Sequence, residues 1–267
     1  MEFTVVLIGA GNMGGAMLRG WIAGGMSPSS ITVVDPGPSQ DMKEYLASHL
    51  IELATDASGV NFPDVLLLAV KPQMMDKVLP SVKSLVGPET VAVSVAAGTT
   101  IAGISAALGN IPVIRSMPNT PSLVGRGITV ACPGNGVTQA HKNNVDQLLR
   151  AIGKLEWVED ETLIDTVTAV SGSGPAYVFH LAECMAQAGI SAGLPPELAM
   201  TLARETVSGA GELLHLSEDE PSVLRKNVTS PGGTTAAALE VLMAPEAMPK
   251  ILEQAVLAAK KRSQELS

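Results

Sequence analysis

The run of six apolar residues at 65–70 constrains the fold of this chain most strongly. A strand with no polar side chain is typical of a parallel sheet that is covered on both faces. Five more short runs predict strands, at 4–8, 31–35, 90–95, 112–115 and 127–131. Helical patterns lie between them, at 13–24, 39–49, 73–86, 100–108 and 138–152. This alternation predicts an α/β fold built on a doubly wound parallel sheet.

The pattern changes after about residue 160, where strand signals stop. Prolines mark the edges of the helix-period segments that follow, at 161–168, 174–189, 195–216, 232–243 and 245–264. We therefore expect two domains, an α/β domain at 1–160 and an all-helical domain at 161–267. Aromatic residues make up only 3% of the chain, so a helical domain of about 100 residues has a modest core. We expect it to bury more apolar surface against a second subunit.

A glycine-rich loop follows the first expected strand and opens a helix. It matches GxGxxG in the context that a dinucleotide site requires. In that interpretation Gly9 permits the turn, Gly11 lets a pyrophosphate approach the backbone, and Gly14 allows the helix to pack closely on the strand. The candidate cofactor-binding residues of this loop are Gly9, Ala10, Gly11, Asn12, Met13 and Gly14. The alternative is a glycine-rich turn with a purely structural role and no ligand.

Asp35 closes the second expected strand, near the distance at which an acidic residue binds the ribose hydroxyls of a dinucleotide. A carboxylate there repels a 2′-phosphate, and residues 36–42 supply no cation to hold one. The sequence therefore favours NADH over NADPH. The alternative is that Asp35 caps the following turn and points away.

Three more loops leave strands at the carboxyl edge of the sheet, where cofactors bind in this fold class. They add these candidate cofactor-binding residues: Ala69, Val70, Lys71, Pro72, Ala97, Gly98 and Asn119. Two prolines frame Asn119 and Thr120, so we expect a rigid loop that positions a nicotinamide. Lys71 as an ordinary solvated lysine, and the Asn119 loop as a purely structural turn, remain open.

A second glycine turn at 228–235 feeds the start of a helix near the other end of the sequence. Pro231 fixes a turn, and the two glycines after it leave backbone N–H groups uncovered at a helix N-terminus. Such a terminus attracts an anion. We therefore expect a small carboxylate to bind at Ser230, Gly232, Gly233, Thr234 and Thr235.

Composition narrows the classes of partner. The net charge of −9 argues against nucleic acid. The histidines and the two cysteines show no metal-ligand spacing, so we expect no metal. The separated cysteines fit a reducing compartment, and no bilayer-length apolar run or signal-peptide pattern is present. We expect a cytoplasmic protein with no membrane partner.

Six segments in matching order and spacing resemble the pyrroline-5-carboxylate reductase family. They are IGAGNMG at 8–14, LAVKP at 68–72, VAAG at 95–98, RSMPNTP at 115–121, SGSGPAYVF at 171–179 and NVTSPGGTTAAALEVL at 227–242. The last segment is the family's signature and is very specific. The resemblance implies a dinucleotide domain followed by a helical domain that interlocks with a second subunit. It also implies homo-oligomers built from dimers, with active sites shared between the subunits.

The reaction that the resemblance implies is hydride transfer from NAD(P)H to 1-pyrroline-5-carboxylate, which gives L-proline in the last step of proline biosynthesis. The backbone around residues 232–234 would bind the substrate carboxylate, and the Thr235 hydroxyl would lie near the ring nitrogen. Glu218 matches a glutamate that lies near that nitrogen in some family members. Thr235 as a simple helix cap, and Glu218 as part of a solvated acidic run, are the alternatives.

Three other functions deserve comparison. A reductase of a related cyclic imino acid is one alternative, because nothing in the sequence indicates the size of the substrate pocket. The β-hydroxyacid dehydrogenases resemble this chain over about the first 20 residues, but their reaction needs a lysine near a glycine-rich helix start in the second domain. No Lys or Arg lies between Lys154 and Arg204. A non-catalytic nucleotide-binding protein would not need the turn at 232–235.

Overall fold

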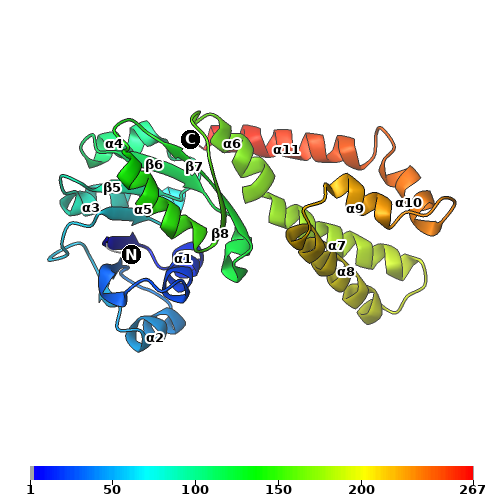
Figure 1. Ribbon diagram of the computed structural model, residues 1–267, viewed down its shortest axis with the longest axis horizontal. Helices are drawn as coiled ribbons and strands as arrows, with labels where there is room; N and C mark the ends of the chain where they lie inside the picture. The colour runs from blue at the N-terminus through cyan, green and yellow to red at the C-terminus, as the bar shows by residue number, and fades with distance from the viewer. Residues whose placement is uncertain (1–2, 267) are drawn as a thin grey trace. The chain divides into compact units, whose positions relative to one another are not determined.

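The structure, a computed structural model, describes residues 3–266 and divides into two compact units (Figure 1). The sheet unit comprises residues up to 172 together with those from 259 onward, and the helical unit comprises residues 173–258. This division differs from the boundary that we expected after residue 160. Residues 161–172 stay with the sheet unit because Ile164 is fully buried there in a cluster with Met117 and Cys132.

The sheet unit contains an eight-stranded sheet in the order β3-β2-β1-β4-β5-β6-β7-β8. The strands are β1 (Val5–Ile8), β2 (Ile31–Val34), β3 (Glu52–Ala54), β4 (Val65–Leu68), β5 (Val91–Ser94), β6 (Val113–Met117), β7 (Gly127–Pro133) and β8 (Gly153–Trp157). All pairings are parallel except that of β6 with β7, which is antiparallel. The expected parallel, doubly wound sheet is confirmed, with this one exception.

Strand β4 is buried on both faces, as its apolar run predicts. Leu67 packs in a cluster with Trp21 and Leu148, and Leu66 and Leu68 pack in a second cluster on the other face. The helices of the sheet unit are α1 (Asn12–Ala23), α2 (Gln40–Ser48), α3 (Met75–Val82), α4 (Ile101–Leu108), α5 (Gln139–Arg150) and α6 (Leu163–Val167). Side chains of α1 and α5 join the first cluster, and those of α3 and α4 join the second.

Local signals in the sequence set the starts of several helices. Ser39 accepts a hydrogen bond from the Met42 N–H at 3.2 Å and caps α2. Thr100 caps α4 in the same way through the Gly103 N–H at 3.2 Å. Helix α4 ends at Gly109, whose φ of 102° is in the left-handed region that glycine adopts without strain.

The helical unit is formed by long helices with short connections. Its elements are α7 (Gly174–Ser191), α8 (Pro196–Leu216), α9 (Pro221–Asn227), α10 (Thr234–Leu242) and the larger part of α11 (Met248–Glu265). Among the described residues, no helix is both long and apolar enough to cross a membrane.

The helical unit leaves many of its own apolar side chains uncovered. Its buried apolar residues are the small Ala186, Ala199 and Ala203. Large side chains are exposed instead, including Phe179 at 66% and Val241 at 70%. An exposed apolar surface of this extent is typical of a protein interface, in line with the expectation of a second subunit.

Four elements differ from the sequence expectations. The edge strands β3 and β8 were not predicted, because they are short and carry exposed polar residues such as Glu52 and Glu156. Helix α9 occupies a segment that we expected to be a loop. The gap expected between helices at 169–173 is closed by a π-helical turn (Thr168–Gly172) that joins α6 to α7.

Candidate active site

The loop after β1 is shaped by three glycines with different roles. Gly9 has a φ of +88°, and a side chain there would meet the carbonyl oxygen of Ala69 at 2.9 Å. At Gly14 a Cβ would overlap the carbonyl oxygen of Gly9. These two glycines are therefore required by backbone conformation and by the packing of α1 on the loop.

Gly11 is different, because a Cβ at this position would meet nothing within 4 Å. It has a φ of −70°, so neither its conformation nor its packing requires glycine. It lies at the N-cap of α1, where no side chain caps the helix and the amides of the first turn have no intrahelical acceptor. An open N-terminus beside free space fits the approach of a pyrophosphate.

Asp35 holds the glycine loop against the end of β2. One carboxylate oxygen accepts a hydrogen bond from the Ala10 N–H at 2.8 Å, and the other accepts one from the Gly37 N–H at 2.9 Å. The side chain thus caps the turn after β2, as our alternative interpretation held, but it also faces the glycine loop. Each oxygen keeps a lone pair with which it can accept a ribose hydroxyl.

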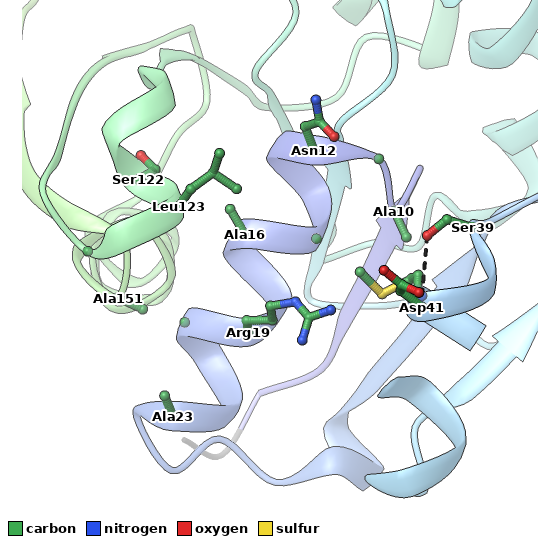
Figure 2. Close-up of a pocket in the computed structure, with 15 residues that line it drawn as sticks. Ala10, Asn12, Ala16, Arg19, Ala23, Ser39, Asp41, Ser122, Leu123 and Ala151 are labelled. Atoms are coloured by element: carbon green, nitrogen blue, oxygen red, sulfur yellow. Dashed lines mark hydrogen bonds between the residues drawn. The ribbon is translucent and has the colours of Figure 1, made fainter. Parts of the chain in front are cut away.

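A hollow of about 450 Å³ runs along the outer face of α1 from the glycine loop (Figure 2). Small residues of α1 form its floor, with the Arg19 guanidinium, Ser39 and Asp41 at its side. The guanidinium lies 4.1 Å from the ring centre of Tyr45. Sequence reasoning missed this hollow, although the spacing of Gly11, Gly15, Ala16, Gly20 and Ala23 along one helix was a signal for it.

The other expected cofactor loops also lie at the carboxyl edge of the sheet. Ala69 follows β4, and its N–H donates to the Ile8 carbonyl at 2.9 Å, which joins this loop to the end of β1. Val70 follows it, and Lys71 is exposed at the start of a 3-10 helix (Pro72–Met74). Ala97 and Gly98 follow β5. Since β1, β4 and β5 are adjacent and parallel, the sheet brings these loops together.

Asn119 follows β6 and is buried. Its side-chain oxygen accepts a hydrogen bond from the Ile128 N–H at 2.9 Å. The Asn119 carbonyl also accepts from the Ser122 N–H at 3.1 Å. The side chain therefore holds this loop against β7, which is the structural role that the sequence left open.

In the helical unit, residues 230–233 form a tight turn that leads directly into α10. The Gly233 N–H donates to the Ser230 carbonyl at 3.0 Å, and Gly232 has a φ of +71°. A Cβ at Gly233 would overlap the Ser230 hydroxyl, which would have to rotate away to make room for it. The chain folds this way because Pro231 presets the first turn position and Gly232 accepts the positive φ of the second.

The start of α10 has the features of an anion site. Gly233 is the N-cap residue, and no side chain caps the helix. The amides of Thr234, Thr235 and Ala236 are therefore available, because the first amides of a helix have no intrahelical acceptor. Thr235 is half-buried, and no hydrogen bond joins its hydroxyl to another described residue. Thr235 is thus not acting as a helix cap.

Glu218 lies in the exposed connection between α8 and α9. The neighbouring Asp219 N–H donates to the Ser217 hydroxyl at 3.0 Å, which shapes this turn. Among the described residues, no hydrogen bond or ion pair joins Glu218 to the turn at 230–235. Glu218 is therefore the expected site residue with the least support from its surroundings.

Comparisons with known proteins cover nearly the whole chain. Residues 161–266 match the family described as pyrroline-5-carboxylate reductase dimerisation, and residues 4–98 match the family described as NADP oxidoreductase coenzyme F420-dependent. The pyrroline-5-carboxylate reductase of Pseudomonas aeruginosa is 41% identical over 264 residues, which cover 98% of this chain and 96% of the relative.

Solved structures of such reductases resemble this chain over nearly its whole length. The structure of a pyrroline-5-carboxylate reductase from Coxiella burnetii has a TM-score of 0.92 and 34% identity, and covers 100% of this chain and 99% of that one. The Plasmodium falciparum pyrroline carboxylate reductase with NADP bound has a TM-score of 0.82 and 26% identity, covering 99% of this chain and 98% of its own.

Proposed function

This chain belongs to the pyrroline-5-carboxylate reductase family, and on that basis we propose how its residues carry out the reaction. The enzyme reduces 1-pyrroline-5-carboxylate to L-proline with NAD(P)H, in the final step of proline biosynthesis. The observation that carries this function is 41% identity over 98% of the chain to a reductase of that name. The protein is a homo-oligomer, as indicated by the matched dimerisation family and by the exposed apolar side chains of the helical unit.

The reaction adds a hydride to the carbon of a C=N bond and a proton to the nitrogen. NAD(P)H supplies the hydride when it is bound. The protein's task is to hold the imino acid in the correct orientation, to neutralise its carboxylate and to exclude water.

We assign the substrate carboxylate to the N-terminus of α10. The amides of residues 234–236 and the hydroxyl of Ser230 are the donors, and Gly232 and Gly233 keep the approach to them open. A helix N-terminus with no internal cap stabilises a carboxylate through these amides and the helix dipole. The lack of a side-chain cap supports this assignment.

We assign Thr235 to the ring nitrogen as the catalytic hydroxyl. Its freedom from internal hydrogen bonds supports the role, because the hydroxyl can accept from the iminium or donate to the imine. Glu218 is the second catalytic candidate, as a negative charge that would stabilise the cationic nitrogen. Its exposed place among Asp219 and Glu220 equally fits a solvated acidic turn.

The sheet unit fits a dinucleotide, and we assign the pyrophosphate to the free space over Gly11. The backbone of the loop at 9–14 would bind it, with the edge loops at 69–72 and 97–98 bordering the nicotinamide half. Asn119 belongs to this assignment as the residue that stiffens the last edge loop.

We further propose that the enzyme prefers NADH to NADPH. The carboxylate of Asp35 lies beside the glycine loop, where the ribose of a dinucleotide would bind, and residues 36–42 contain no Lys or Arg. A 2′-phosphate near this carboxylate would suffer like-charge repulsion. Arg19, which flanks the adjoining hollow, is stacked on Tyr45.

The substitution Asp35→Asn is expected to raise the ratio of kcat/KM for NADPH to that for NADH about tenfold, because it removes one unit charge; the loss of one of the two backbone hydrogen bonds to this side chain affects both cofactors. Initial rates with each cofactor below saturation measure the ratio. Glu89→Gln is the matched control, since it removes an exposed charge before β5, at the opposite edge of the sheet. A wild-type enzyme that already favours NADPH would contradict the role given to Asp35.

Oxidation of NADH and NADPH in the presence of 1-pyrroline-5-carboxylate is the direct test of the activity. Formation of proline in step with cofactor oxidation is the expected result. Faster turnover of a six-membered cyclic imino acid than of 1-pyrroline-5-carboxylate would move the assignment to that related substrate. A folded dimer that binds cofactor without turnover would favour a nucleotide-binding role.

We also propose that each active site is shared between two subunits, with the cofactor held by one chain and the substrate carboxylate by the other. The exposed apolar faces of the helical unit support an intimate dimer. The family resemblance supports the sharing itself.

Mixed dimers test the sharing. A chain with Gly11→Val, which blocks the proposed cofactor site, is refolded with an equal amount of a chain with Thr235→Val. In half of the dimers, one of two sites then has both intact parts, so activity should recover to about a quarter of wild type. Sites contained within one chain would give no recovery, and each variant refolded alone serves as the control.

A further inference from the structure

The last turn of α11 returns to the sheet unit and is anchored there by a buried serine. Ser263 is 5% exposed, and its hydroxyl donates to a carboxylate oxygen of Asp165 at 2.7 Å. The Ser263 carbonyl accepts from the Leu266 N–H at 3.1 Å, which closes the turn that follows. This partly buried contact joins residues 98 positions apart in the sequence.

Asp165 belongs to a buried charge network centred on Arg115. The Arg115 side chain is 3% exposed, and its Nη1 donates to Glu161 at 3.0 Å. Its Nη2 lies 3.8 Å from the Asp165 oxygen that accepts from Ser263. Two nitrogens of the guanidinium, Nε and Nη2, have no hydrogen-bond partner among the described residues. The buried cation therefore depends on where these two carboxylates are held.

The same network reaches the loop between β5 and α4. The Glu161 oxygen that binds Arg115 also accepts from the Ile101 N–H at 2.8 Å, at the start of α4. The other end of the loop is held by the Ala96 N–H, which donates to the Ser94 hydroxyl at 3.2 Å. Between these two points lies Gly98, with a φ of +73°.

Leu266 covers this loop directly. A Cβ at Gly98 would lie 2.6 Å from the Leu266 carbonyl oxygen and 3.0 Å from its carbonyl carbon. The absence of a side chain at Gly98 thus admits the turn after α11, in addition to permitting the positive φ. The loop at 95–100 is held at three points, by Ser94, Glu161 and Leu266.

We propose that the Ser263–Leu266 turn positions the loop at 95–100 and thereby sets cofactor affinity, with Ser263 as the positioning residue. The proposal rests on the proposed function, in which this loop borders the nicotinamide. Without the Ser263 hydroxyl, Asp165 loses a charge-assisted hydrogen bond and the turn over Gly98 loses its anchor. The loop would then have to become ordered when the cofactor binds, which lowers the affinity for the cofactor.

The test compares Ser263→Ala with Arg262→Ala in the full-length enzyme. Arg262 lies next to Ser263 but makes an exposed ion pair with Glu265 at 2.9 Å, so its loss should leave the buried anchor intact. Fluorescence titration gives the Kd of the preferred cofactor, and steady-state rates give KM for each substrate. Hydrogen exchange of the peptide at 95–101 reports on the loop without requiring activity.

For Ser263→Ala we expect the cofactor Kd to rise about threefold to tenfold, as the loss of a partly buried charge-assisted hydrogen bond implies. The KM for 1-pyrroline-5-carboxylate should stay near the wild-type value, and exchange at 95–101 should become faster. Arg262→Ala should change neither the Kd nor the exchange. Ser263→Thr keeps the hydroxyl and should restore both.

Unchanged cofactor Kd and unchanged exchange in a folded Ser263→Ala enzyme would overturn the proposal. Equal increases in the KM of both substrates would also overturn it, because they would indicate a general structural role. Tighter cofactor binding would show that the turn obstructs the site. If the wild-type enzyme bound neither cofactor, the proposed function would fail, and the exchange data would still decide whether the turn holds the loop.

Discussion

Replacing Thr235 with valine is expected to lower kcat about a hundredfold or more while cofactor affinity stays unchanged, because a positioned hydroxyl beside the reacting nitrogen contributes on this scale. Valine keeps the branched shape of threonine and removes the hydroxyl. Since that hydroxyl makes no internal hydrogen bond, the melting temperature should not fall. Steady-state kinetics, cofactor titration and thermal unfolding measure the three quantities.

Thr234→Val is the matched control for this prediction. Thr234 is the first residue of α10 and is exposed, whereas Thr235 is half-buried. Its substitution should therefore cost much less turnover. Thr235→Ser keeps a hydroxyl and should retain most of the activity. If Thr235→Val kept full activity, Thr235 would have no catalytic role. Another group would then have to supply the proton.

Gly11→Ala is expected to weaken cofactor binding without affecting folding, whereas Gly14→Ala is expected to destabilise the fold. At Gly11 the new methyl group meets no protein atom, so the protein should fold normally. The same methyl group would occupy the space assigned to the pyrophosphate, and we expect the cofactor Kd to rise at least about tenfold. Fluorescence titration of the folded variant measures this change.

At Gly14 the methyl group would overlap the Gly9 carbonyl oxygen, so helix and loop must separate. We expect a loss of about 3 kcal/mol or more in the free energy of unfolding, which denaturant titration measures. A stable Gly14→Ala protein would show that α1 can shift on the sheet. If Gly11→Ala bound the cofactor with normal affinity, the assignment of the pyrophosphate to this loop would be wrong.

Most of the fold could be predicted because its main elements carry local signals. The fully apolar run of β4 indicates burial on both faces, and side chains of Leu66 and Leu67 do pack in separate clusters. The elements that were missed have weak local signals. Strand β3 is three residues long at a sheet edge, and β8 alternates exposed Lys154 and Glu156 around the buried Leu155.

The candidate site was predictable where its chemistry depends on adjacent residues. The open amides at Gly11 and at the start of α10 follow from the glycines and prolines beside them. The contact of Asp35 with Ala10 and that of Asn119 with Ile128 were not predictable, since these partners lie 25 and 9 residues away. The hollow beside Arg19 was missed for the same reason, because its lining comes from separate parts of the chain.

The sequence by itself determined the class of fold, the family, and the two backbone turns that fit a dinucleotide and a carboxylate. Each of these depends on neighbouring residues, whose conformational preferences act over a few positions. Only the tertiary structure decided that Gly98 lies under Leu266 and that Ser263 anchors to Asp165 beside the buried Arg115. Such contacts join residues far apart in the sequence, and the folding of the whole chain sets the distances between them.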